Sequence, residues 1–304
     1  MVFENRRFLL LILTTNTMRR ILPNPNWVLS LIFVGTVLSP VAYSQSLVDG
    51  FMKGKGHGSL VVSYSWEQYD EFYFADTKMD APPPYGGQIT TQSIGLYGIY
   101  GLADELDVVL NVPYINAQGD GSEAVTDQSV GGLQDAELML KWRPLVFESE
   151  SGTLGFLAAA GIATPFSDYA ADSVLSIGNG ATRFDGRLIT HYLASTGLFA
   201  ELQAGYSIRG DEVPNATLLS AKVGFAAANF YVDLWSATQI SDSDAPDIGQ
   251  APFSQTRVNY TQIGITGYYP FSSAFGVSVG FAQYLSGRNV GISTRLSGGL
   301  IYSF

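Results

Sequence analysis

The chain has no cysteine and little charge. Cysteine is absent from all 304 residues, which excludes disulfide bonds, thiolate nucleophiles and thiolate metal sites. Charged residues make up 14%, against roughly 25% in ordinary soluble domains. A soluble protein of this size would therefore have too few charged side chains for its surface. No run reaches the roughly 18 to 20 consecutive apolar residues that a membrane-spanning helix needs, which argues against a helical membrane protein.

Histidine is also scarce, and this limits catalysis. Only His57 and His191 could serve as an imidazole base. His57 lies in a glycine-rich stretch before the first expected strand, and His191 is better explained as a member of a polar network. No nucleophile-elbow, zinc-protease or phosphate-binding motif occurs. We therefore predict no catalytic residues, no metal site, no cofactor and no enzyme activity, and the net charge of −11 disfavours nucleic-acid binding.

The first 44 residues are typical of an export signal. Paired arginines at 19–20 supply a positive start, residues 27–38 form an apolar run, and residues 42–44 fit a small-x-small cleavage site. Translation would then begin at Met18, and a retained N-terminal membrane anchor is the alternative. We expect a leader with a signal peptide at residues 1–44, a periplasmic N-terminal lead-in at 45–57, and a β-barrel at 58–304.

Apolar and polar residues alternate along most of the remaining chain. Leu198, Leu202 and Tyr206 share one face of an expected strand, opposite Glu201 and Gln203, because successive side chains of a strand point to opposite sides. Many of these segments run to ten residues or more, against about five or six for an average strand. Around residue 262 the apolar residues change from one face of the expected strand to the other, which predicts a bulge. The segments are 58–67, 88–101, 105–117, 132–143, 153–164, 181–193, 197–209, 217–227, 229–240, 255–269, 274–285 and 291–304.

Short and long connections alternate in step with the strand count. Links such as 102–105 are short, 144–152 is the longest of that set, and stretches such as 68–87 are long. Outer-membrane barrels show this asymmetry, with short periplasmic turns and long external loops. We therefore predict an all-β fold, a transmembrane antiparallel up-and-down β-barrel of about 12 strands (range 10–14), monomeric and in the bacterial outer membrane.

The long connections are strongly acidic and hold only two basic residues, Lys78 and Arg288. Solvated loop surface is the simpler interpretation. Bridging of divalent cations to an anionic outer leaflet is the alternative, because clustered carboxylates are suitable oxygen ligands.

Charged residues on the opposite strand faces should line the barrel lumen, because they would be costly against hydrocarbon. They could neutralise one another and fill a narrow barrel. Alternatively, they could leave an aqueous path in which the arginines favour anionic or polarisable solutes. The predicted lumen-lining residues are Asp135, Glu137, Lys141, Arg143, Arg183, Asp185, Arg187, His191, Glu201, Arg209, Lys222, Asp233, Arg257 and Arg295.

The last residues also alternate, with Leu300, Tyr302 and Phe304 on one face. We expect a final strand that closes the barrel against the first strand and leaves no open edge. The aromatic end resembles that of outer-membrane proteins generally. The resemblance implies that these three residues form the signal read by the barrel-assembly machinery.

Several motifs resemble one family. They are "IYGLADELDVVLNVPY" (99–114), "GGLQDAELMLKWRP" (131–144), "GIATPF" (161–166) and "GNGATRFDGRL" (178–188), together with the aromatic carboxyl end. The chain resembles the outer-membrane proteins of the meta-pathway phenol-degradation transporter family over essentially its whole mature length. The resemblance implies a channel for aromatic or other hydrophobic small molecules. The sequence departs from that expectation in its highly charged predicted lumen, which shows no continuous apolar path.

The function predicted from these features is passive passage of small solutes through an outer-membrane channel. Its expected partners are outer-membrane lipid, the barrel-assembly machinery and a small-molecule solute. The alternative is a closed structural or adhesive barrel that acts through its acidic extracellular loops.

Overall fold

The structure is a computed structural model that describes residues 48–304 except 83–84, 123–125, 172, 174 and 248–252. Nearly all of this part consists of strands and the connections between them, and its helical content is one short 3-10 turn, η1 (Phe253–Gln255). No helix in these residues is long and apolar enough to cross a bilayer. The predicted leader, residues 1–44, lies outside the described residues.

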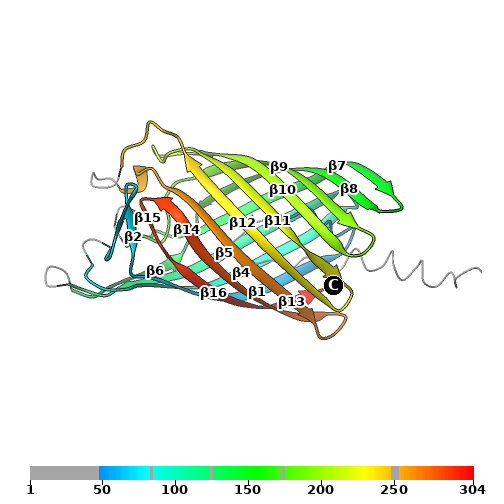
Figure 1. The fold of residues 1–304 in the computed structure, drawn as a ribbon, viewed down its shortest axis with the longest axis horizontal. Coiled ribbons are helices and arrows are strands. Elements are labelled where there is room, and N and C mark those ends of the chain that lie inside the picture. The colour runs from blue at the N-terminus through cyan, green and yellow to red at the C-terminus, as the bar shows by residue number, and fades with distance from the viewer. Residues whose placement is uncertain (1–47, 83–84, 123–125, 172, 174, 248–252) are drawn as a thin grey trace, which may run out of the picture. The chain divides into compact units, whose positions relative to one another are not determined.

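Twelve long strands of the described chain form a closed antiparallel barrel (Figure 1), which confirms the predicted fold. Each strand pairs with its neighbours in the sequence, and β1 also pairs with the last strand. The long strands are β1 (Gly58–Tyr69), β4 (Ile89–Ala103), β5 (Leu106–Gly119), β7 (Asp135–Ser149), β8 (Gly152–Pro165), β9 (Arg183–Ala194), β10 (Leu198–Arg209), β11 (Ala216–Ala227), β12 (Phe230–Ser241), β13 (Asn259–Pro270), β14 (Phe275–Arg288) and β16 (Thr294–Ser303). A short strand, β6 (Gln128–Leu133), pairs with β5 just before β7 begins.

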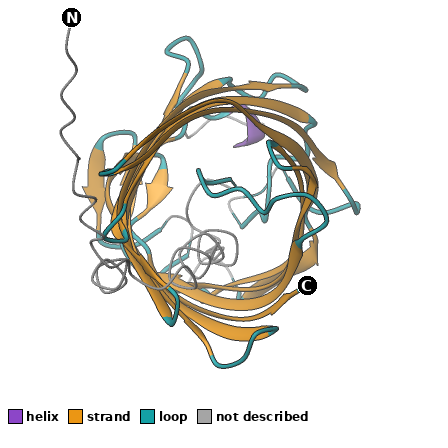
Figure 2. Cartoon of the chain, turned by 90° about the vertical axis from the view of Figure 1, so that its right-hand side faces the viewer, coloured by secondary structure: helices purple, strands orange, loops and turns teal. Residues whose placement is uncertain are grey.

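The first and last strands close the barrel. β1 and β16 are antiparallel, with Val62 opposite Leu300. Beyond the ladder, Phe304 N donates to Gly58 O at 3.0 Å and Gly58 N donates to Phe304 O at 2.9 Å. Figure 2 looks along the barrel and shows a closed ring of strands with loop segments inside it. Closure pairs the backbone groups that an open edge would leave unsatisfied in lipid.

Side chains alternate between the outside of the barrel and its bore. On β10, Leu202 points outward and is 64% exposed, whereas Glu201 and Gln203 are buried. On β9, Leu188 is 70% exposed while Ile189 is buried. Exposed aliphatic and aromatic side chains occur in this way on every long strand. An apolar surface of this extent on a closed barrel matches a hydrocarbon environment rather than water.

The hairpin between β7 and β8 differs from the prediction. β7 continues to Ser149 and β8 begins at Gly152, so most of the expected connection 144–152 is paired strand. A register shift between Trp142 and Leu145 accommodates Pro144, which has no N–H to donate to the ladder.

The start of β13 also differs, because residues 253–255 form η1 and the strand begins only at Asn259. Further along β13, the register shifts between Thr261 and Gln262 where it pairs with β14, which confirms the predicted bulge.

Two ends of the barrel are distinguished by their connections. The turn end carries the short hairpins and residues 58 and 304, and the loop end carries the long connections. At the loop end, β2 (Phe72–Phe74) pairs with β3 (Thr77–Met79) and with β15 (Val290–Gly291) in a small separate sheet. The first and last long connections are therefore joined by backbone hydrogen bonds.

Lys78 and Arg288, the two basic residues that the sequence places in the long connections, are paired with acids. Lys78 Nζ lies 2.7 Å from Glu71 Oε2. Arg288 Nε donates to Asp247 Oδ1 at 2.7 Å, and Arg288 Nη1 lies 3.8 Å from Asp76 Oδ2. These contacts join three loop-end connections.

The Asp247–Arg288 contact predicts an unusual titration. Hydrogen bonds from Arg288 lower the pKa of Asp247 from 3.8 to about 2. The stabilising contact is therefore complete above the ordinary carboxyl pKa and is lost as pH falls through about 2. We expect the carboxyl carbon resonance of Asp247 to titrate near 2 in the intact protein and at a clearly higher pH in Arg288→Gln, where the hydrogen bond from Asn289 remains. Lys78→Gln, which removes a cation paired with Glu71, should leave the titration at about 2, and a midpoint near 3.8 in the unaltered protein would contradict the ion pair.

Phe304 contributes to closure through its ring as well as its backbone. The ring centroid lies 5.7 Å from that of Tyr302 and 6.3 Å from that of Tyr100, and both pairs are stacked. Aromatic pairs contribute roughly 0.5–1.5 kcal/mol each. We expect Phe304→Ala to lower the yield of inserted barrel, measured by heat-modifiable electrophoretic mobility. Phe271→Ala, which removes an exposed ring stacked on Phe275 at the same end, is the control and should have a smaller effect on yield.

Candidate functional site: the barrel lumen

Residues 48–53, the inner segment, lie inside the barrel at its turn end. Val48, Asp49, Phe51, Met52 and Lys53 are all buried although none belongs to a strand. The sequence predicted a periplasmic lead-in at residues 45–57, but no pattern in it indicated that six of these residues lie within the bore. Polar and apolar contacts with the strand walls hold the segment there.

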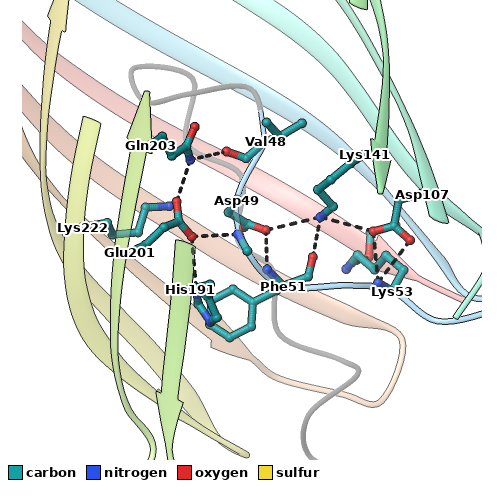
Figure 3. Close-up of polar contacts among 12 residues, drawn as sticks. Val48, Asp49, Phe51, Lys53, Asp107, Lys141, His191, Glu201, Gln203 and Lys222 are labelled. Atoms are coloured by element: carbon teal, nitrogen blue, oxygen red, sulfur yellow. Dashed lines mark hydrogen bonds and ion pairs between the residues drawn. The ribbon is translucent and has the colours of Figure 1, made fainter. Parts of the chain in front are cut away.

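One polar cluster connects the inner segment to β5 and β7 (Figure 3). Lys141 on β7 and Asp107 on β5 are fully buried, with Lys141 Nζ 3.2 Å from Asp107 Oδ2 and 3.6 Å from Asp49 Oδ1. Lys141 Nζ also donates to Phe51 O. Asp107 accepts the backbone N–H of Lys53 at 3.2 Å. The buried charges are thus paired across three parts of the chain, as burial of an ion requires.

A second cluster holds the other side of the segment against β10 (Figure 3). Glu201 Oε2 accepts the backbone N–H of Gly50 at 2.7 Å and lies 3.1 Å from His191 Nδ1. Gln203 Nε2 donates to Val48 O at 2.9 Å and to Glu201 Oε1 at 2.6 Å. A side chain at position 50 would collide with His191, because a Cβ there would lie 2.2 Å from the imidazole. Glycine therefore permits the segment to approach the wall this closely.

Apolar packing completes the contact. The Phe51 ring lies 4.5 Å from that of His191 and 5.2 Å from that of Phe199, both edge-on. Around the segment, buried apolar side chains from many strands form one cluster with Phe51 and Met52, including Val61, Tyr97, Ile99, Val109, Met139, Leu157, Ile189, Tyr231, Tyr268 and Ile301. The bore is therefore partly apolar at the turn end, whereas the sequence predicted a highly charged lumen without a continuous apolar path.

The loop half of the bore contains a polar cavity of about 320 Å³, which we call the arginine chamber. It is lined by Arg183 and Arg187 of β9, Arg209 of β10, Gln239 of β12 and Tyr260 of β13, among others. A second cavity of about 280 Å³ lies against β1, β4 and β5 and is lined mainly by small polar side chains, with Arg295 of β16.

Arg183 is the centre of an ion-pair network in the chamber wall. Its Nη1 lies 3.0 Å from Asp135 Oδ2, its Nη2 lies 2.7 Å from Glu137 Oε2, and its Nε lies 3.2 Å from Asp185 Oδ2. The hydroxyl of Tyr169, in the β8–β9 connection, donates to Asp135. Burial, together with this hydrogen bond, raises the pKa of Tyr169, so its hydroxyl remains a donor over the physiological range.

The other residues predicted to line the lumen are distributed along the bore. Arg295 pairs with Glu67 of β1, and Lys222 Nζ lies 3.6 Å from Asp233 Oδ2. Arg143 is partly buried near the β7 bulge, towards the turn end.

Arg257 differs from the prediction, because it lies in the connection before β13 rather than in a strand. Its backbone carbonyl accepts a hydrogen bond from Asn289 Nδ2 at 2.7 Å, among the loop-end contacts.

The main functional residues that sequence reasoning missed are Asp49, Phe51 and Lys53. They lie outside any alternating pattern, so no periodic signal marks them. Tyr260 was also not predicted in the lumen, because β13 is the strand whose parity shifts.

Comparison with solved structures shows a shared fold. An outer membrane channel from Pseudomonas putida F1 has 16% sequence identity and a TM-score of 0.64, covering 88% of this chain and all of that one. The KdgM porin gives a TM-score of 0.47 at 10% identity, covering 80% of this chain and 99% of its own. The translocator domain of the autotransporter NalP from Neisseria meningitidis gives 0.45 at 9% identity, covering 92% and 95%. No curated protein matches the sequence.

A family comparison covers most of the chain. The model described as "Putative MetA-pathway of phenol degradation" matches residues 58–297, from the start of β1 into β16. The matched range includes the four internal motifs quoted above, which lie along β4, β5, β7, β8 and β9. The chain therefore belongs to the family of the putative MetA pathway of phenol degradation.

Proposed function

We propose that this protein is a channel of the bacterial outer membrane that allows small solutes to pass through its bore. The observation that carries this proposal is the pair of polar cavities, about 320 and 280 Å³, lined by inward-facing strand residues of a closed barrel together with residues of its connections. The apolar outer surface and the alternation of short and long connections support an outer-membrane setting, with the loop end outside. The fold shared with an outer membrane channel agrees with this proposal.

The inner segment sets the width of the proposed path. It is packed against β5, β7 and β10 at the turn end, between the polar cavities and the periplasmic opening of the proposed channel. Solutes therefore pass beside this segment or displace it, and we expect a small conductance. The family description, which names phenol degradation, adds uptake of aromatic compounds as the finer proposal.

Planar bilayers test the channel directly. Purified folded protein should give discrete current steps, and vesicles that contain it should admit small neutral solutes faster than protein-free vesicles. Phenol should enter such vesicles faster than a neutral sugar if the finer proposal is correct. A folded barrel that remains silent in bilayers and impermeable in vesicles would refute the channel.

A closed structural or adhesive barrel is the second candidate, and the observation that favours it is the inner segment filling the turn end. In that case, shortening the acidic connection at 241–258 would abolish binding to an envelope or surface partner and leave solute flux at background. We expect the opposite, namely that flux changes with alterations in the bore. We also propose that the barrel acts as a monomer in outer-membrane lipid and is inserted by the assembly machinery.

A further inference from the structure

Two arginines of the chamber have no acidic partner. Neither Arg187 nor Arg209 has a carboxylate oxygen within 4.0 Å among the residues that the structure describes. The Nε of Arg187 is buried and has no hydrogen-bond partner in the described chain. Among the described residues, the Arg209 side chain donates hydrogen bonds to neutral groups, from Nε to Ser207 Oγ at 3.2 Å and from Nη2 to Gln239 Oε1 at 2.9 Å. Both arginines are only partly buried, so their guanidinium groups can take a further partner from the cavity that they line.

The acids of the chamber are already engaged elsewhere. Asp135, Glu137 and Asp185 all converge on Arg183, although Asp185 Oδ1 itself has no partner among the described residues. Arg187 and Arg209, on the adjacent strands β9 and β10, are therefore the chamber arginines without an ion-pair partner among the described residues.

The backbone leaves room for these side chains. Arg187 lies opposite Gly205 on β10, and a Cβ at position 205 would come within 2.9 Å of Arg187 Cγ. The glycine thus allows the arginine side chain to lie across the neighbouring strand. Much of the remaining lining is apolar or aromatic, from Leu218, Val258 and Tyr260. The cavity has the size and mixed lining of a small-molecule site, for which about 300 Å³ is the lower limit.

We propose that the arginine chamber binds a small organic acid as it passes through the barrel. Arg187 and Arg209 bind the carboxylate, because guanidinium groups match its planar geometry and form charge-assisted hydrogen bonds. The apolar body packs on Leu218, Val258 and Tyr260. This inference rests on the proposed channel function and names the solute class that the channel favours.

Benzoate and benzamide are the matched probes, because they share a ring and differ in the charge of one substituent. Binding to the purified full-length barrel in detergent, measured by isothermal titration calorimetry at low salt, should be detectable for benzoate and much weaker for benzamide. Arg187→Gln and Arg209→Gln should each weaken benzoate binding about tenfold or more, since each removes hydrogen bonds to a charged group. Arg143→Gln removes the same charge elsewhere in the bore and should leave the affinity unchanged.

The outcomes separate this inference from the channel itself. Benzoate should also reduce the single-channel current in the unaltered protein, and less so in the two chamber variants. Equal affinity for benzoate and benzamide, or an Arg143→Gln defect as large as that of Arg187→Gln, would overturn the inference while current steps persist. Absence of current with selective benzoate binding would instead overturn the channel and keep the site. If heat-modifiable mobility shows that Arg187→Gln does not fold, Arg209→Gln decides the result.

Discussion

Deletion of residues 48–53 is expected to raise single-channel conductance several-fold. The inner segment occupies the bore at the turn end, and its removal leaves a wider opening beside β5, β7 and β10. The wall should survive the deletion. Lys141 keeps Asp107 as its partner, and Glu201 keeps His191 and Gln203.

The control for this experiment is Lys55→Ala, which alters an exposed residue just beyond the inner segment. It should leave the conductance unchanged. Heat-modifiable mobility would confirm that both proteins are folded. Equal conductance with and without residues 48–53 would show that the segment does not narrow the path.

Asp107→Ala is expected to be the most destabilising single substitution in the bore. Asp107 and Lys141 are both fully buried, and Asp107 also accepts the backbone N–H of Lys53. Removing one partner of a buried ion pair costs about 3–5 kcal/mol, because the remaining charge is left uncompensated. Asp49, 3.6 Å from Lys141 Nζ, can offset only part of this cost.

Urea unfolding of the barrel in lipid vesicles, followed by tryptophan fluorescence, measures the effect. Asp104→Ala is the matched control, since among the described residues this exposed carboxylate accepts only the backbone N–H of Lys55, and its loss should cost about 1 kcal/mol or less. The double variant Asp107→Leu with Lys141→Met should recover part of the lost stability, because Lys141 is then no longer left as an uncompensated buried charge, while Asp49 loses its contact with Lys141 Nζ. An Asp107→Ala protein as stable as Asp104→Ala would contradict the buried-pair account.

The fold was largely predictable because a lipid-exposed barrel imposes a strict rule on its strands. Every lipid-facing position must be apolar, so alternation such as that on β10 is preserved along nearly the whole strand. The predicted strand boundaries were wrong where the backbone geometry departed from this alternation. The predicted strand 132–143 ended before Pro144, but the register shift before Leu145 accommodates this proline and β7 continues beyond it. β13 begins later than predicted because residues 253–255 form η1.

The site was less predictable, because the lumen obeys no such rule. Inward-facing Val61, Ile99 and Met139 are apolar because they pack around Phe51 and Met52, and nothing local in the sequence indicates that partner. The alternation along each strand identified which charged residues face the lumen, but it did not indicate which of them form ion pairs with one another. Gly50 contacts Glu201 across 151 residues of sequence, a separation over which spacing carries no information.

The location of the inner segment also constrains the order in which the molecule can form. Residues 48–53 precede β1 in the chain, yet many of their contacts are with strands far along the sequence, among them β5, β7, β9 and β10. If β1 and β16 paired first, the segment that carries Phe51 would have to enter an already closed barrel from one end. If β1 and β16 instead pair last, the sheet closes around a segment that already lies on its inner face. The same step then completes both the barrel and the constriction inside it.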